Sequence, residues 1–511
     1  MARKREKTFH FEEATIADLH AAYRSGNLNC LSLVKAYFDR IEAYDKKGPA
    51  INAILTLNPK AHETARSFDR ILARRGFVGP LHGIPVVLKD NYETAEMPTT
   101  AGSRALETLI PSTDAFVVKR LRDAGALILA KTNTHELALV GLTCSSLGGQ
   151  TRNPYDLTRT PGGSSGGTGA AIASNFAVLG TGTDTVNSIR SPASANSLVG
   201  LRPTRGLISR AGVVPVSFTQ DAVGPITRTV EDAARMLDVM VGYDPADPVT
   251  AWGVGNVPKT YTAYLKKGGL RGARLGVVRT LFGSKPEHEE VNRVMAEAIT
   301  SMELQGATPV DVEDPALDSA KWIEKGDVQR WEFKTVFNQY LEKLGPRAPV
   351  KTLAEFLATG NYHKASLEKF LTEAERLESP LDEPEYRNRL LQIPGLQQRL
   401  LSLMADHRLD ALVYPLQKRL VVPIGDPDQI DRNGIIAALA GFPAIDVPAG
   451  FSKPTTTAPI GVPIGLDFLG RPWSEGRLIQ LAYAFEQATK FRQPPRCVRP
   501  LAVALNGTGK T

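Results

Sequence analysis

The sequence predicts an α/β protein built on a mixed, largely buried β-sheet that helices cover on both faces. Short apolar runs of strand length recur along the chain, among them 84–88, 126–130 and 273–278. Segments whose apolar residues have helical spacing separate these runs. Uninterrupted apolar strands are typical of sheets with both faces covered, and their alternation with helices indicates an α/β architecture.

The first part of the chain predicts three helices and a strand. A helix is expected to begin near Thr15, because Asp18 stands three residues later in a variant of the capping box. A second helix carries its apolar stripe on Val34, Tyr37, Phe38, Ile41 and Tyr44. After an apolar stretch at 51–55 and a helix over 61–75, the strand at 84–88 leads directly into Lys89.

The same alternation continues towards the C-terminal end. Ser112 and Thr113 are candidate N-caps for a helix that contains Phe116, Val117 and Leu121. Further elements are expected as strands at 126–130, 273–278, 308–312, 411–414, 444–447 and 464–469, and as helices at 287–304 and 475–488.

The segment 315–407 differs in character from the rest of the chain. It is rich in Glu, Lys, Arg and aromatic residues and has few strand signals. We interpret it as a helical insertion or cap that helps to shape a substrate pocket. Because no flexible linker separates it, we expect one domain over 8–495, with flexible tails at 1–7 and 496–511.

Composition excludes several classes of function. The net charge of +7 over 511 residues is modest, and basic and acidic residues are interleaved, so no nucleic-acid surface is indicated. No apolar run is long enough to cross a membrane. Cys30, Cys144 and Cys497 are few and far apart, which favours a reducing cytoplasm over a disulfide framework. We expect no metal and no cofactor, because no His or carboxylate pair has ligand spacing.

The candidate chemistry lies in two glycine-rich segments and one lysine. Segment 162–167 contains Ser164, and segment 182–190 contains Ser188. Glycine lets a substrate approach the backbone closely, and a serine needs a base within hydrogen-bond reach to act as a nucleophile. Lys89 follows a buried strand, where burial favours its neutral, basic form. Together these residues indicate an acyl-transfer hydrolase that uses no histidine or metal.

A second interpretation makes Ser165 the nucleophile. Segment 163–167 fits the Gly-x-Ser-x-Gly pattern of a nucleophile elbow, which requires a strand directly before it. Residues 153–160 are polar and contain proline, which argues against that strand. His135 and Glu136 could line the site, although a hydrogen-bonded structural role is more usual for a lone histidine.

The chain also resembles the amidase signature family. The likeness is carried in order by segments 83–91, 162–167, 182–190, 192–194, 199–206 and 221–229. It extends from about residue 14 to 247 and resumes over 437–488. The resemblance implies the amidase signature fold and a free-standing amidase.

The resemblance also implies roles for individual residues. Ser188 would be the nucleophile, Ser164 a relay serine held in a cis peptide, and Lys89 the general base. The oxyanion would be bound by the backbone N–H groups of Thr185, Val186, Asn187 and Ser188. Supporting hydrogen bonds and ion pairs around the nucleophile are expected from Asp184, Arg190, Thr183 and Ser165.

Two positions depart from the family pattern, which commonly has glycines where this chain has Val186 and Asn187. Asn tolerates a positive φ, so we expect Asn187 to keep a tight turn. Val186 is stiff and is expected to narrow the pocket. We interpret the change as altered substrate preference.

The sequence therefore predicts hydrolysis of a linear, non-peptidic amide, with a small-molecule substrate and neither nucleic acid nor membrane as partner. The sequence leaves open whether the protein forms a homodimer. One alternative is the glutaminase subunit of a tRNA-dependent amidotransferase, which requires a partner chain. Another is a non-catalytic small-molecule binding protein on the same fold. Ester and carbamate substrates also stay open, because the relay chemistry differs only in the leaving group.

Overall fold

An 11-stranded mixed sheet forms the centre of the protein, whose computed structural model describes residues 9–501. Its strands run in the spatial order β1-β3-β2-β6-β8-β7-β12-β13-β11-β9-β10. They are β1 (Ile54–Leu57), β2 (Pro85–Lys89), β3 (Leu127–Thr132), β6 (Leu179–Asp184), β7 (Val199–Arg202), β8 (Ala222–Thr227), β9 (Arg274–Val278), β10 (Thr308–Val312), β11 (Ala411–Pro415), β12 (Ala444–Phe451) and β13 (Pro463–Leu469). A separate hairpin joins β4 (Cys144–Ser145) to β5 (Gly149–Gln150).

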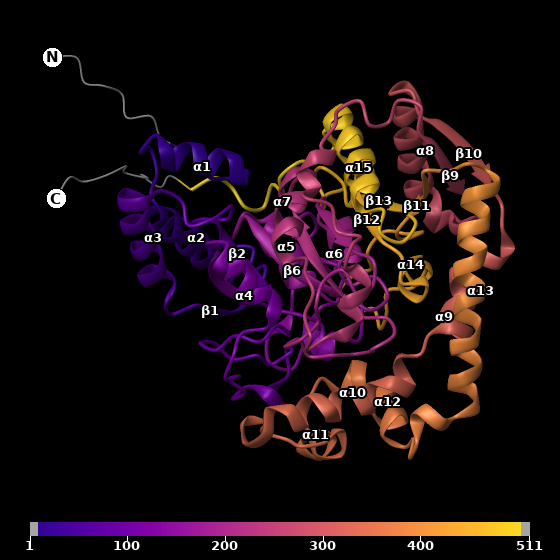
Figure 1. Ribbon diagram of the computed structural model, residues 1–511, viewed down its shortest axis with the longest axis horizontal. Coiled ribbons are helices and arrows are strands. Elements are labelled where there is room, and N and C mark those ends of the chain that lie inside the picture. Colours follow the sequence, from indigo (N-terminus) through magenta and orange to yellow (C-terminus); the bar gives the residue numbers. More distant parts are fainter. Residues whose placement is uncertain (1–8, 502–511) are drawn as a thin grey trace.

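Helices cover both faces of this sheet, so the predicted fold class is confirmed (Figure 1). The helices of the first half of the chain are α1 (Ile16–Arg24), α2 (Cys30–Tyr44), α3 (Ala61–Arg75), α4 (Phe116–Asp123), α5 (Gly166–Ala173), α6 (Arg190–Ala195) and α7 (Val230–Met240). Those of the second half are α8 (Glu289–Leu304), α9 (Ser319–Gly326), α10 (Gln329–Leu344), α11 (Leu353–Thr359), α12 (Lys364–Glu375), α13 (Pro384–Asp406), α14 (Ile435–Ala440) and α15 (Glu475–Thr489).

The central part of the sheet positions the two serine segments. Helix α5 follows the first segment and packs against β2 and β6, whereas α6 follows the second and packs against β7, β12 and β13. β6 pairs in parallel with β2 and antiparallel with β8. Both serine segments therefore lie at ends of buried elements in the middle of the sheet.

The N-termini of α1 and α4 can be compared with the N-cap residues that the sequence predicts. Thr15 caps α1, with the reciprocal bonds to Asp18 that the sequence predicts. The caps predicted for α4 are wrong, because its N-cap is Ala115 and no side chain caps it. Its first amides instead donate to tertiary backbone carbonyls, from Ala115 to Glu93 and from Phe116 to Ala211.

The segment between β10 and β11 consists of helices α9 to α13, which line the right and lower margin of Figure 1. Within residues 9–501, no helix combines the length and apolar character needed to cross a membrane. At the other end of the chain, Val498 is buried and its carbonyl accepts a hydrogen bond from Arg40. The carbonyls of Val498 and Arg499 thus both bind Arg40 of α2, whereas 1–8 and 502–511 lie outside the described residues.

Candidate active site

Lys89 is the last residue of β2, and its side chain is fully buried. Its Nζ lies 2.7 Å from Ser164 Oγ and 2.7 Å from Thr183 Oγ1. Thr183 also accepts a hydrogen bond from Asn91. Because β2 and β6 are parallel neighbours, the lysine at the end of one strand meets the threonine of the other, which places Thr183 in direct contact with the predicted base.

Burial has a large effect on the ionisation of Lys89. Removal of the ammonium group from water lowers the pKa of Lys89 to about 7, while Asp184 and Asp221 partly oppose the shift. A substantial fraction of Lys89 is therefore neutral near physiological pH, and a neutral amine has the lone pair that a general base requires.

Ser164 is held by its backbone. The peptide bond between Gly163 and Ser164 is cis, as the resemblance implies. The Ser164 carbonyl accepts hydrogen bonds from the His135 N–H at 2.9 Å and from Thr134 Oγ1 at 3.0 Å. These bonds fix the hydroxyl of Ser164 beside Lys89.

Ser188 lies in the turn between β6 and α6, and 8% of the residue is exposed. Its carbonyl accepts a hydrogen bond from the Ser165 N–H at 3.3 Å, which joins the two serine segments. Within residues 9–501, no hydrogen bond links the hydroxyls of Ser188 and Ser164. The structure thus assembles Lys89 with Ser164 and leaves the hydroxyl of Ser188 without a partner among the described side chains.

The backbone before Ser188 offers unused donors. In the described part of the chain, the N–H groups of Thr185, Val186, Asn187 and Ser188 donate no hydrogen bond. Free amides at a nucleophile are the usual components of an oxyanion hole. Asn187 lies in the bend between β6 and α6, and its backbone does not adopt a positive φ. Val186 packs against an apolar cluster that contains Tyr414 and Ile435.

Buried ion pairs hold the turn that carries Ser188. Asp184 binds Arg190 at 3.1 Å and Arg202 at 2.9 Å, and all three side chains are fully buried. Burial raises the pKa of Asp184, but the two guanidinium groups outweigh it and hold this pKa below its usual value. Arg190 also donates to the Val186 carbonyl at 2.8 Å. Asp184 and Arg190 thus contact the turn directly.

The elbow interpretation does not fit the surroundings of Ser165. Ser165 is fully buried, and its hydroxyl donates to the Thr183 carbonyl at 3.3 Å. Helix α5 begins directly after it. The preceding residues 160–164 form no strand. Ser165 therefore supports β6 from within the core.

A cavity of about 400 Å³ adjoins the site. Thr183 and Thr185 line it on one side, and residues of α10 line it on the other. The helical segment thus contributes to a pocket, as the sequence predicts.

Two further residues support the site without an assigned role in the sequence. Thr143 donates to the Gly162 carbonyl at 2.7 Å, and nothing in its sequence surroundings indicates this contact. Asp221 accepts from Thr185 Oγ1 at 2.6 Å, and it opens a segment that carries the family resemblance. His135 takes the structural role, because its ring contacts Ser366 and burial lowers its pKa to about 3.

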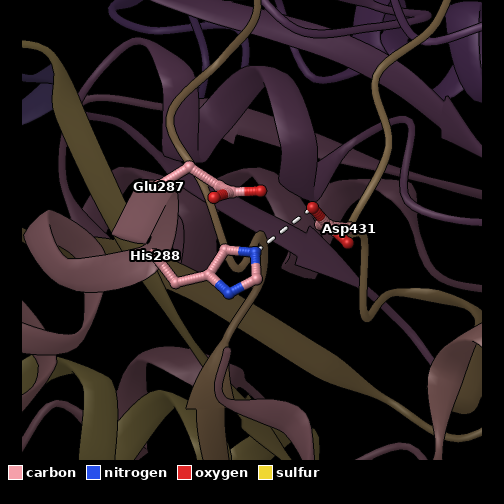
Figure 2. Close-up of side chains that lie close together, drawn as sticks. All are labelled: Glu287, His288 and Asp431. Atoms are coloured by element: carbon pink, nitrogen blue, oxygen red, sulfur yellow. Dashed lines mark hydrogen bonds and ion pairs between the residues drawn. The ribbon is translucent and has the colours of Figure 1, made fainter. Parts of the chain in front are cut away.

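A cluster with ligand-like spacing lies elsewhere, and the sequence did not predict it. Donor atoms of Glu287, His288 and Asp431 lie within 4.8 Å of one another (Figure 2). His288 Nδ1 accepts the Lys285 N–H at 3.1 Å, so the proton of its neutral ring is on Nε2, which faces Asp431 at 3.3 Å. A protonated Nε2 has no lone pair for a metal, and the contact is a hydrogen bond between the 3-10 helix Pro286–His288 and the loop that contains Asp431.

Comparison with known proteins places this site in a family. The family model described as Amidase matches residues 32–479. A protein of Arabidopsis thaliana named "Probable amidase" is 37% identical over 96% of this chain and 93% of its own length. A glutamyl-tRNA(Gln) amidotransferase subunit of Thermoanaerobacter pseudethanolicus is 32% identical over 95% of this chain and 98% of its own.

Solved structures agree with the sequence comparisons. The native peptide amidase of Stenotrophomonas maltophilia superposes with a TM-score of 0.84 at 38% identity, over 95% of this chain and 99% of that one. An amidase family protein of Bacillus anthracis gives a TM-score of 0.82 at 31% identity, over 95% of this chain and 93% of that one. With a family model that spans most of its length and relatives that match it nearly end to end, this chain belongs to the amidase family.

Proposed function

We propose that the protein hydrolyses the C–N bond of carboxylic acid amides through a covalent acyl-enzyme on Ser188. The observation that carries this proposal is the 2.7 Å contact between Lys89 Nζ and Ser164 Oγ, made by a buried lysine whose pKa is about 7. The family and its amidase relatives support amide hydrolysis as the reaction class.

The residues have distinct tasks in this reaction. Neutral Lys89 accepts a proton from Ser164, and Ser164 in turn accepts the proton of Ser188. As it loses this proton, the Oγ of Ser188 bonds to the carbonyl carbon of the amide. The unused N–H groups of 185–188 stabilise the resulting oxyanion, and one such donor is typically worth about 10²–10³ in rate. The C–N bond then breaks as the relay returns the proton to the leaving amine. Water attacks the acyl-enzyme and releases the acid.

Covalent labelling tests the proposal directly. The protein is treated with a fluorophosphonate, and the modified peptide is mapped by mass spectrometry. We expect the label on Ser188, with loss of label in Ser188→Ala and retention in Ser165→Ala. Label on Ser165 would instead support the elbow interpretation. A protein that takes no label and hydrolyses no amide, yet binds small amides, would be the non-catalytic binding protein.

A glutaminase role within a larger complex is the second candidate, because the glutamyl-tRNA(Gln) amidotransferase relative matches nearly the whole chain. A panel of aliphatic, aryl and C-terminal peptide amides, with glutamine included, distinguishes the two. We expect hydrolysis of simple amides by the chain alone. Ammonia release from glutamine only, and only with a copurifying partner protein, would reverse the order of the candidates.

A further inference from the structure

Three buried polar side chains form a row across the sheet. They lie behind the turn between β6 and α6 that carries Ser188, which we call the nucleophile turn. Asp446 of β12 is the direct partner of Asp467 of β13, which is in turn the direct partner of Tyr414 of β11. All three residues are fully buried. Helix α6, which begins at Arg190, packs against β12 and β13. The row therefore lies close to the start of the helix that follows Ser188.

Asp446 has no hydrogen-bond donor among the described residues. Neither of its carboxyl oxygens has a partner, and a Cβ built at Gly465 would lie 2.4 Å from Oδ1. The carboxyl group thus lies directly against the backbone of β13. An ionised carboxylate without donors in such a place is very unfavourable, and the group takes up a proton instead. Burial and the charge of Asp467 accordingly raise the pKa of Asp446 well above its usual value.

Asp467 is placed differently. Its Oδ2 accepts a hydrogen bond from Arg190 Nη1 at 2.8 Å, whereas its Oδ1 has no donor among the described residues. Burial raises the pKa of Asp467, and the guanidinium group of Arg190 opposes this rise. Oδ1 of Asp467 is therefore an acceptor without a donor, opposite a carboxyl group that needs to be protonated.

The charge balance of the cluster also indicates a single proton on its carboxyl groups. The cations in ion pairs with it are Arg190 and Arg202, and the acids are Asp184, Asp446 and Asp467, while Lys89 and Asp221 lie nearby outside these ion pairs. Burial and Asp467 raise the pKa of Tyr414 well above its usual value, so its phenol stays neutral. Two cations balance two carboxylates when one of the three carboxyl groups carries a proton. Asp184 accepts from both arginines and is ionised, which leaves the proton to the other two.

We propose that Asp446 and Asp467 hold one proton between them, with Asp446 as its donor, and that the pair thereby positions Arg190. Asp467 fixes one end of the guanidinium group, and Nη2 at the other end donates to the Val186 carbonyl at 2.8 Å and the Gly434 carbonyl at 2.9 Å. Val186 belongs to the turn whose N–H groups face the reaction. The two acids are thus positioning residues, and this role rests on the proposed hydrolysis at Ser188.

Isosteric amides test the two halves of the proposal separately. Asp446→Asn reproduces a protonated carboxyl group, so we expect it to lower kcat and labelling of Ser188 much less than Asp467→Asn does. Asp467→Asn leaves Arg190 with one carboxylate fewer. For Asp467→Asn, we expect fluorophosphonate labelling of Ser188 and kcat to fall at least about tenfold, with KM within about twofold, since small displacements of reacting groups are expensive. Asp232→Asn, at a buried carboxyl group of α7, is the matched control.

The shared proton has a readout that does not depend on activity. At about pH 8 the infrared spectrum of the wild type should contain a protonated-carboxyl band that Asp446→Asn lacks and Asp232→Asn retains. Burial raises the pKa of Asp232 only to about 6, so it is ionised at that pH. An unchanged band in Asp446→Asn, or labelling of folded Asp467→Asn at the wild-type rate, would overturn the proposal. Failure of the wild type to label at Ser188 would instead count against the proposed function, while the infrared comparison still decides where the proton is.

Discussion

Lys89 Nζ and Ser164 Oγ are 2.7 Å apart in a site where burial lowers the pKa of the lysine to about 7. The lysine can accept a proton only in its neutral form, so kcat/KM should rise with pH through about 7 and level off above it. Below that pH, each unit should cost about tenfold, because the neutral fraction falls by that factor. A profile of kcat/KM from about pH 5 to 9 with an amide substrate measures this, and a flat profile across pH 7 would contradict it.

Removal of the lysine should abolish most of the turnover. A positioned general base contributes about 10²–10⁴ in rate, so we expect Lys89→Ala to lose activity within that range while it still folds. Lys119→Ala is the control, because Lys119 is exposed on α4. The initial rates of the two variants are compared at equal concentration. Near-normal turnover by Lys89→Ala would exclude it as the base.

The ion pairs behind the nucleophile turn should be important for stability. Arg202→Leu leaves part of the buried charge of Asp184 uncompensated, and breaking a buried pair in this way costs about 3–5 kcal/mol of unfolding free energy. Arg235→Leu breaks a half-exposed pair with Glu231 on α7 and should cost no more than about 0.5 kcal/mol. Denaturant unfolding of both variants measures the contrast. Equal costs would mean that the buried pair contributes no more than a surface pair.

Close packing at the centre of the sheet should make Gly224 difficult to replace. A Cβ at this position of β8 would lie 2.1 Å from the Leu201 carbonyl oxygen, so Gly224→Ala should destabilise the protein by about 1–3 kcal/mol. At Gly268 a Cβ would meet nothing within 4 Å, and Gly268→Ala should be nearly neutral. Thermal unfolding compares the two alanines, and similar melting temperatures would contradict the packing argument.

The glycines of the central strands also explain what the sequence could not predict. Apolar runs such as 444–447 and 464–469 predict strands and are confirmed as parts of β12 and β13. β6 and β8 are not among the expected strands, because they contain Gly180, Gly182, Gly224 and Pro225, which have low strand propensity. Tertiary contact decides there: a Cβ at Gly180 would lie 2.3 Å from Thr168 of α5.

For the candidate site, the sequence predicts residues that stand in local motifs, but it does not predict contacts between segments that are far apart in the sequence. The family resemblance indicates Lys89, Ser164 and Ser188 together because each stands in a recognisable segment. The contact of Asp446 with Asp467 depends on strand register, and that of Thr143 with the backbone of 162–164 depends on how two loops meet. No local pattern encodes either contact, so only the folded chain reveals them.

The helices α9 to α13 leave the sheet after β10 and return to it at β11. Both strands pair in parallel with β9, so the chain leaves the sheet at the C-terminal end of β10 and re-enters it at the N-terminal end of β11, opposite the start of β9. Because pairing with β9 fixes both ends of this excursion, the helices between them can change in length or sequence without a shift in the register of the sheet. Because residues of α10 line the cavity together with Thr183 and Thr185, changes in these helices can reshape the cavity while the turn that carries Ser188 stays the same.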